Sequence, residues 1–237
     1  MPDPLAKSLE KKLKGVVGDA WVISDPHRLL AYESDGLTAY RMLPMAVVLP
    51  NDTDEVSRVL EFLSKEAVPV VPRGAGTGLS GGALAGEGCI VVGTARMNRI
   101  LEVDQENRLA LVQPGVINAD LTDAASPFGL YYAPDPSSQV ICSIGGNLAE
   151  NSGGAHCLKY GFTVHHVLGL EAILPDGELV HFGGPALDAP GLDLLGVLVG
   201  SEGTLAVVTE ITLNLLRKPA AVQTLLAAFD STDAAGN

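Results

Sequence analysis

A loop with four glycines in eight residues sets the tightest limits on how this chain can fold. The loop lies in segment 72–83 (PRGAGTGLSGGA), and its four glycines are Gly74, Gly76, Gly78 and Gly81. A loop so poor in side chains exposes successive backbone N–H groups, which form a concave anion site suited to a diphosphate when they point inward. Thr77 and Ser80 add hydroxyl donors, and Arg73 is the only cation in the loop. The pattern favours a diphosphate-binding loop over a mobile loop without a ligand, because ordering many glycines costs backbone entropy.

Two familiar phosphate motifs fit this loop poorly. Residues 76–81 match G-x-G-x-x-G, but that fingerprint requires a helix directly after it, aimed at the phosphates. Residues 82–88 contain three further glycines and are too short for a helix before the next apolar run. The Walker A pattern also fails, because no Lys–Ser/Thr pair follows the loop. An NAD-dependent Rossmann enzyme is therefore a disfavoured alternative.

Apolar runs around the loop predict a small parallel α/β lobe. Strands are expected over 46–49 and 68–71, and a further one over 89–92. Between the first two, Thr53 is expected to cap an amphipathic helix. A strand, a helix and a strand this close together form a right-handed crossover with parallel strands.

The residues that follow predict a larger, mostly antiparallel lobe. The expected strands are 100–103, 109–112, 170–174, 178–182 and a long, bent strand over 204–216. Two of the connections, 104–107 and 175–177, carry turn residues that favour hairpins. A short helix over 192–199 is expected to pack beneath the long strand. The predicted fold class is therefore α+β, with a parallel lobe followed by an antiparallel one.

The 237 residues suffice for one large domain and the beginning of another. We expect one domain over 1–219, with lobes of about 1–95 and 96–219. Residues 220–237 are expected to begin a new strand and then a helix capped by Ser231 or Thr232. This segment would be the start of a truncated C-terminal domain.

Two other segments are rich in glycine. The first contains two Gly-Gly pairs, over 143–147 and 150–154, and follows the rigid, hydroxyl-rich stretch 134–138. It permits close approach of the backbone to a flat ligand, although ordinary turn chemistry explains it equally well when it is taken alone. The second, 200–204 (GSEGT), is by itself best explained as a helix-to-strand connection.

Charge and cysteine content exclude several classes of function. The formal net charge of −13 disfavours a nucleic-acid partner. The three cysteines, Cys89, Cys142 and Cys157, lack the spacing of a zinc site, a disulfide framework or an iron–sulfur cluster. The adjacent His165 and His166 point in different directions on a helix or a strand, so no metal site is expected. No apolar run is long enough to span a bilayer, and the start lacks a signal peptide, so a cytoplasmic protein with at most peripheral membrane association is expected.

Taken together, the three glycine-rich segments resemble one family. The segments PRGAGTGLSGG, PDPSSQVICSIGGNLAENSGG and VGSEGTLAVVTE, in this order and spacing, resemble the FAD-binding domain of vanillyl-alcohol oxidase-type (PCMH-type) flavoproteins. AENSGGAHCLKYGFTVHHVLGLEAILPDGELV and GLDLLGVLVGSEGTL resemble the large subunits of glycolate oxidases more closely, with FAD-dependent D-lactate dehydrogenases as near relatives. The resemblance covers essentially the whole chain and corresponds to the N-terminal half of such a subunit.

The resemblance implies a set of residues that bind FAD. Residues 72–78 would wrap the diphosphate, Ser143 and Asn147 with their neighbours would line the ribityl chain and flavin edge, and Glu202 and its neighbours would lie along the adenosine end. The implied cofactor-binding positions are Pro72, Arg73, Gly74, Ala75, Gly76, Thr77, Gly78, Leu79, Ser80, Pro134, Asp135, Ser138, Cys142, Ser143, Gly145, Gly146, Asn147, Ala149, Ser152, Gly153, Gly154, Gly161, Glu202, Gly203 and Val208. One departure is Ala206, where the family usually has glycine.

The resemblance also implies how FAD is held. Covalent members of the wider family attach the flavin through the histidine of an R-S-G-G-H motif. The matching stretch here, 73–77, ends in Thr77, which cannot form that linkage, so non-covalent FAD is expected.

The implied activity is oxidation of a small 2-hydroxy acid, with glycolate favoured and D-lactate as the alternative. Such chemistry needs a flavin beside the substrate Cα–H, a base and a cation for the carboxylate. In the family the base and the cation come from the C-terminal domain, so the catalytic residues are not expected within this chain. A second flavin-binding subunit and an iron–sulfur subunit are the implied partners, and any contact with the inner face of the membrane is expected to run through these subunits. A non-catalytic flavin-binding or assembly subunit is a further alternative.

Overall fold

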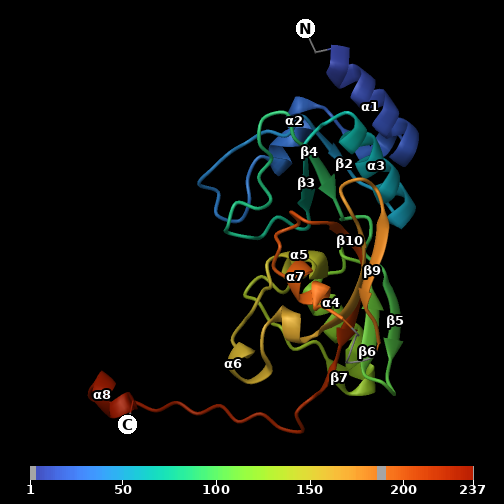
Figure 1. The fold of residues 1–237 in the computed structure, drawn as a ribbon. Helices are drawn as coiled ribbons and strands as arrows, with labels where there is room; N and C mark the ends of the chain where they lie inside the picture. Colours follow the sequence, from blue (N-terminus) through green and yellow to red (C-terminus); the bar gives the residue numbers. More distant parts are fainter. Residues whose placement is uncertain (1–3, 186–190, 237) are drawn as a thin grey trace.

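The computed structural model describes residues 4–185 and 191–236 and arranges them around two main β-sheets (Figure 1). The first sheet is mainly parallel, and helix α3 (Thr53–Lys65) connects two of its strands. Its strands, in spatial order, are β1 (Val22–Ile23), β2 (Ala46–Val48), β4 (Ile90–Gly93) and β3 (Val70–Arg73). Strands β2, β4 and β3 run parallel, and β1 pairs antiparallel with β2. The predicted crossover is therefore confirmed, with strands shifted by one or two residues.

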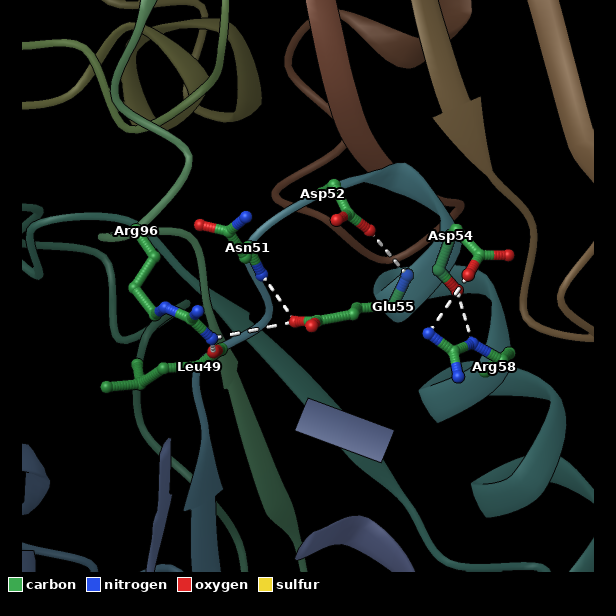
Figure 2. Close-up of polar contacts among 7 residues, drawn as sticks. All are labelled: Leu49, Asn51, Asp52, Asp54, Glu55, Arg58 and Arg96. Carbon is green, nitrogen blue, oxygen red and sulfur yellow. Dashed lines mark hydrogen bonds and ion pairs between the residues drawn. The ribbon is translucent and has the colours of Figure 1, made fainter. Parts of the chain in front are cut away.

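The cap of α3 differs from the prediction. Asp52 is the N-cap residue, and its carboxylate accepts a hydrogen bond from the amide of Glu55 (Figure 2). The hydroxyl of Thr53, the predicted cap, instead donates to Glu171 in the second sheet at 2.6 Å. Aspartate and threonine compete closely as caps, and a tertiary partner for Thr53 decided the outcome.

The second sheet is antiparallel throughout. Its strands, in spatial order, are β5 (Ile100–Asp104), β6 (Leu109–Val112), β10 (Val207–Asn214), β8 (Val167–Ile173) and β9 (Leu179–Gly183). Both predicted hairpins form, β5 with β6 and β8 with β9. The predicted long strand is interrupted after Asn214, and β11 (Leu216–Arg217) pairs with β7 (Leu130–Tyr131) instead.

Short helices cover the second sheet and the junction between the sheets (Figure 1). The remaining α-helices are α1 (Pro4–Val17), α2 (Pro26–Leu29), α4 (Asn118–Ala125), α5 (Ile144–Ala149), α6 (Cys157–Tyr160), α7 (Leu194–Leu198) and α8 (Thr232–Gly236). The 3₁₀ turns are η1 (Asp19–Trp21), η2 (Leu30–Tyr32), η3 (Ser126–Phe128) and η4 (Thr163–His165). The predicted helix beneath the long strand is confirmed as α7. The mixed α+β class, with a parallel part followed by an antiparallel part, is confirmed as well.

The two sheets share a hydrophobic core. Ile173 and Val207 from the second sheet are buried in the same cluster as Val56 and Leu63 of α3. The hydroxyl of Ser57 on α3 donates to the carbonyl of Gly177 in the β8–β9 turn at 2.7 Å. Helix α3 therefore fixes the first sheet against the second.

The prediction of a strand after residue 220 is wrong. Residues 220–230 are exposed, leave the body as an extended segment and belong to no strand of the described structure (Figure 1). A strand needs a neighbour that supplies backbone hydrogen bonds, and this segment has none among the described residues. The helix that follows is confirmed, and the Ser231 hydroxyl caps it by accepting from the amide of Ala234.

Candidate cofactor site

The glycine-rich loop leaves the end of β3 and carries a run of unpaired amides. Within the described parts of the chain, the amides of residues 74–79 donate to no protein acceptor. The loop is nevertheless fixed, because the amide of Gly36 donates to the Gly78 carbonyl and the amide of Gly81 donates to the Asp35 carboxylate. Consecutive free amides on an anchored loop can bind an anion without further rearrangement. As predicted, no helix follows the G-x-G-x-x-G match.

Arg73 braces this loop rather than projecting into open space. Its guanidinium donates to the carbonyls of Ser34 and Ala83 and lies over the Tyr32 ring. Burial lowers the pKa of Arg73, although Tyr32 and the nearby Asp35 act in the opposite direction. A Cβ at Gly76, which has a φ of +72°, would collide with this guanidinium. The loop thus requires glycine there both for its backbone angles and for space.

Helix α5 brings the second glycine cluster against the loop. Ser143 caps this helix by accepting from the amide of Gly146 at 3.2 Å. A Cβ at Gly74 would overlap the Ser143 hydroxyl, so the two segments are in close contact. Gly145 packs directly on Pro114. The sequence did not reveal α5, since paired glycines are poor helix formers and only the Ser143 cap signals it.

Three adjoining cavities meet at Gly74. The first, of about 260 Å³, lies between the glycine loop and α5. The second, of about 60 Å³, extends beside the start of β10, and the third, of about 220 Å³, extends past Thr94 and Asn98. A fourth and larger cavity, of about 520 Å³, is lined mainly by apolar residues, from the end of α3 to β3 and from the turn before β10, and none of residues 74–79 lines it. The cluster of three is therefore the better candidate for a phosphate-containing ligand.

Most of the expected site residues line the first cavity. They are Pro72, Arg73, Gly74, Ala75, Gly76, Thr77, Gly78, Leu79, Ser138, Cys142, Ser143, Gly146, Asn147, Ala149, Ser152 and Glu202. Gly145, Gly203 and Val208 line the second. Three segments that are far apart in sequence thus meet around one space.

The other expected residues lie nearby without lining these cavities. They are Ser80, Pro134, Asp135, Gly153, Gly154 and Gly161. Ser80 donates to Glu150 at 3.3 Å, and the Asp135 carboxylate hydrogen-bonds to His156. A Cβ at Gly154 would overlap Asp135. The contacts of Ser80, Asp135 and Gly154 are with other residues of the protein.

Three polar residues of the first cavity were missed from the sequence. They are Asp35, Ser137 and Glu150. Burial, followed by the negative charge of Glu202, raises the pKa of Glu150, and Asp35 adds to this effect. Ser137 and Glu150 lie inside segments already singled out, whereas nothing local marks Asp35, which tertiary folding brings to the loop.

The turn 200–204 has an unusual backbone. Glu202 has a φ of +54°, a conformation that is uncommon for residues other than glycine. Its amide donates to the Ala149 carbonyl at 2.8 Å, which ties the turn to α5. Ala206 is buried and does not adopt a positive φ, so alanine fits without backbone strain.

The described residues contain no group of histidine, cysteine and carboxylate side chains that could hold a metal. His166 is buried and bonds to the Tyr160 carbonyl, whereas His165 accepts from the amide of Phe162. The described part of the chain also contains no helix long and apolar enough to cross a bilayer.

Comparison with known proteins gives consistent matches. A family model described as "FAD binding domain" matches residues 44–183. The chain is 49% identical over 236 residues to "Glycolate oxidase subunit GlcD" of Escherichia coli (strain K12), covering all of this chain and 47% of that protein. It is 43% identical over 192 residues to "D-lactate dehydrogenase" of Archaeoglobus fulgidus, covering 81% of this chain and 43% of that protein. The chain therefore spans about half the length of the curated relatives it matches.

A solved structure agrees on the fold. A structure of alkyldihydroxyacetonephosphate synthase superposes with a TM-score of 0.80 at 24% identity. The match covers 91% of this chain and 41% of that one.

Proposed function

We propose that this chain is the FAD-binding part of a flavin-dependent 2-hydroxy-acid dehydrogenase that oxidises glycolate to glyoxylate. The premise is that the chain belongs to the FAD-binding domain family and that FAD is its cofactor. The 49% identity to a glycolate oxidase subunit favours glycolate. D-lactate is the second candidate substrate, because a D-lactate dehydrogenase is 43% identical.

The observation that carries the proposal is the run of unpaired amides over residues 74–79, in a segment that lines the cavity between the glycine loop and α5. A diphosphate needs several donors, and consecutive backbone amides supply them without a cation. Glycine at 74 and 76 is required for space, because a side chain there would overlap Ser143 or Arg73 and displace the loop. The residues therefore fit the diphosphate of FAD.

We assign the rest of the cofactor by continuity from this point. The ribityl chain and flavin edge would lie along Ser143, Asn147 and their neighbours in the 260 Å³ cavity. The adenosine would extend toward Gly203 and Val208, which line the 60 Å³ cavity. Arg73 serves as a brace for the loop, since its guanidinium is already engaged by two carbonyls.

When bound, FAD supplies the oxidant and accepts the hydride of the substrate Cα–H. This chain would contribute the position of the flavin. Among the described residues, Arg73 is the only cation that lines any of the four cavities. Because Arg73 is engaged elsewhere, we infer that the cation for the substrate carboxylate, and the base, come from outside residues 1–237.

We also propose partners for the complete protein. Its relatives are named as subunits, which supports a multi-subunit enzyme. A second flavin-binding subunit and an iron–sulfur subunit would carry electrons onward, and we propose that they hold the complex at the inner face of the membrane. Cys89, Cys142 and Cys157 are free, and the described residues contain no group of side chains that could hold a metal cluster.

The test is anaerobic reduction of the purified full-length subunit, followed by the flavin absorbance. Glycolate is expected to bleach the flavin faster than D-lactate does. Bleaching only by D-lactate would transfer the assignment to the second candidate. If no 2-hydroxy acid reduces the flavin, the assignment as a dehydrogenase is contradicted and a non-catalytic flavin-binding subunit is favoured.

The mode of attachment has its own test. Thr77 cannot form a histidyl–flavin bond, so denaturing the protein is expected to release all of its yellow colour into the supernatant. Colour that precipitates with the protein would show a covalent bond.

A further inference from the structure

Thr94 lies beside the first residue of the glycine loop. It follows β4 directly, and its amide donates to the carbonyl of Arg73 at the end of β3 at 3.0 Å. Because β3 and β4 are parallel, their carboxyl ends share one edge of the sheet. Thr94 and Gly74 are therefore neighbours at the point where the free amides begin.

The Thr94 hydroxyl is a buried polar group without a partner. The residue is 7% exposed, and its Oγ1 has no hydrogen bond within the described structure. Buried hydroxyl groups are normally paired, because leaving one unpaired destabilises the fold. An unpaired group beside a binding cavity suggests that a ligand supplies the missing partner.

Only one of the unpaired buried groups identified in the described residues lies at a cavity. The other two are the Tyr132 hydroxyl and Nδ1 of His166, and neither residue lines any of the four cavities. Thr94 lines both the 60 Å³ and the 220 Å³ cavities, together with Gly74 in each. A ligand that occupies the junction at Gly74 would lie against Thr94.

The backbone around Thr94 is held firmly. Its carbonyl accepts a hydrogen bond from the amide of Met97. The side chain of the nearby Arg96 donates to the Leu49 carbonyl at 2.7 Å and lies over the Trp21 ring. Figure 2 shows the contacts of Arg96 with Leu49 and Glu55. The Thr94 hydroxyl itself is buried in this structure, so a contact with a ligand requires the side chain to turn about χ1.

We propose that the Thr94 hydroxyl donates a hydrogen bond to the diphosphate of bound FAD, alongside the amides of the glycine loop. This inference rests on the proposed function, since it needs FAD in the site. Charged phosphate oxygens are strong acceptors, so the bond would give a buried hydroxyl the partner that the protein does not provide.

The test compares variants by two measurements, FAD affinity from quenching of flavin fluorescence and the melting temperature of the apo-protein. Thr94→Val keeps the shape and removes the hydroxyl, and Thr94→Ser keeps the hydroxyl. Tyr132→Phe is the matched control, because it also removes an unpaired buried hydroxyl but lies away from the cavities. If Thr94→Val does not fold, Thr94→Ala replaces it in both measurements. Competition by ADP, which has the diphosphate but no flavin, locates the contact.

Thr94→Val is expected to bind FAD and ADP about tenfold more weakly, with an apo melting temperature equal to or above that of the wild type. Thr94→Ser and Tyr132→Phe are expected to keep wild-type affinity. Unchanged FAD affinity in Thr94→Val would overturn the inference, as would a loss for FAD without a loss for ADP. A lower apo melting temperature with unchanged affinity would show that a buried water pairs the hydroxyl. Failure of the wild type itself to bind FAD would instead refute the proposed function.

Discussion

At Gly74 a single missing side chain lets two distant segments meet. A methyl group there would overlap the Ser143 hydroxyl and displace either the loop or the start of α5. Such overpacking costs about 1–3 kcal/mol. Glycine at this position therefore lets the loop and the start of α5 lie in contact beside the cavity in which we place the diphosphate.

Replacing this glycine should therefore impair cofactor binding. Gly74→Ala is expected to weaken FAD binding roughly tenfold or more, because the strain falls on the amides that hold the diphosphate. The control is Gly15→Ala in α1, where a Cβ would meet nothing within 4 Å and alanine is the better helix former. Isothermal titration with FAD measures both variants, and equal affinity for Gly74→Ala and wild type would count against the site.

Glu150 gives a prediction about pH. Burial and the charge of Glu202 raise its pKa above the ordinary value of 4.5, so its ionised form destabilises the fold. The destabilisation is absent at a pH well below 4.5 and develops as the pH rises through the raised pKa. Glu150→Gln is therefore expected to melt at a higher temperature than wild type near neutral pH, with the difference shrinking in acid.

Thermal melts from pH 4 to pH 8 measure this difference, with the exposed Glu87→Gln as control. A difference for Glu150→Gln that is constant over the whole range, or that grows in acid, would contradict the assigned cause.

At the scale of elements, contacts between α3 and the second sheet hold the site together. Ile173 of β8 is fully buried in the cluster that contains α3 residues. The glycine loop follows β3 of the first sheet, whereas α5 packs in the core beneath the second sheet, so the cavity between them depends on this packing.

Ile173→Ala is expected to lower the free energy of unfolding by about 2–5 kcal/mol, the usual cost of such a cavity. Urea denaturation measures the loss. Val222→Ala, at a position 79% exposed, should change stability by less than about 0.5 kcal/mol. A loss of under about 1 kcal/mol for Ile173→Ala would mean that the sheets are not packed as described.

The elements also show where sequence patterns succeed and fail. The α3 crossover and the two hairpins follow from apolar periodicity and turn residues, and all three are present. Helix α5 was missed because Gly145 and Gly146 have low helix propensity, yet packing on Pro114 leaves room only for glycine. The strand expected after residue 220 is absent, because apolar residues alone do not provide a partner strand.

The candidate site likewise contains some residues that the sequence predicts and others that only the structure reveals. Residues 72–79 could be predicted from the sequence as part of the candidate site, because a glycine-rich loop exposes its backbone amides whatever its tertiary contacts are. Asp35 could not be identified, because its place at the cavity depends on the hydrogen bond that it accepts from Gly81. The bracing contacts of Arg73 were equally invisible, since their acceptors lie at Ser34 and Ala83.

In the molecule as a whole, the negative net charge opposes binding of the phosphate-containing ligand that we place in the site. The chain carries a net charge of −13, and Asp35, Glu150 and Glu202 line the same cavity as the free amides. A dianionic ligand therefore gains nothing from the overall field and must be held by local donors. The glycolate oxidase subunit that matches the whole chain is about twice as long as this chain.

The most direct test of the account is a titration of the apo-protein with FAD and, separately, with riboflavin, which has the same flavin ring but no diphosphate. Flavin fluorescence gives both dissociation constants. If the amides of residues 74–79 hold the diphosphate, FAD should bind at least about a hundredfold more tightly than riboflavin. Equal affinities, or no binding of FAD by the folded protein, would contradict the account.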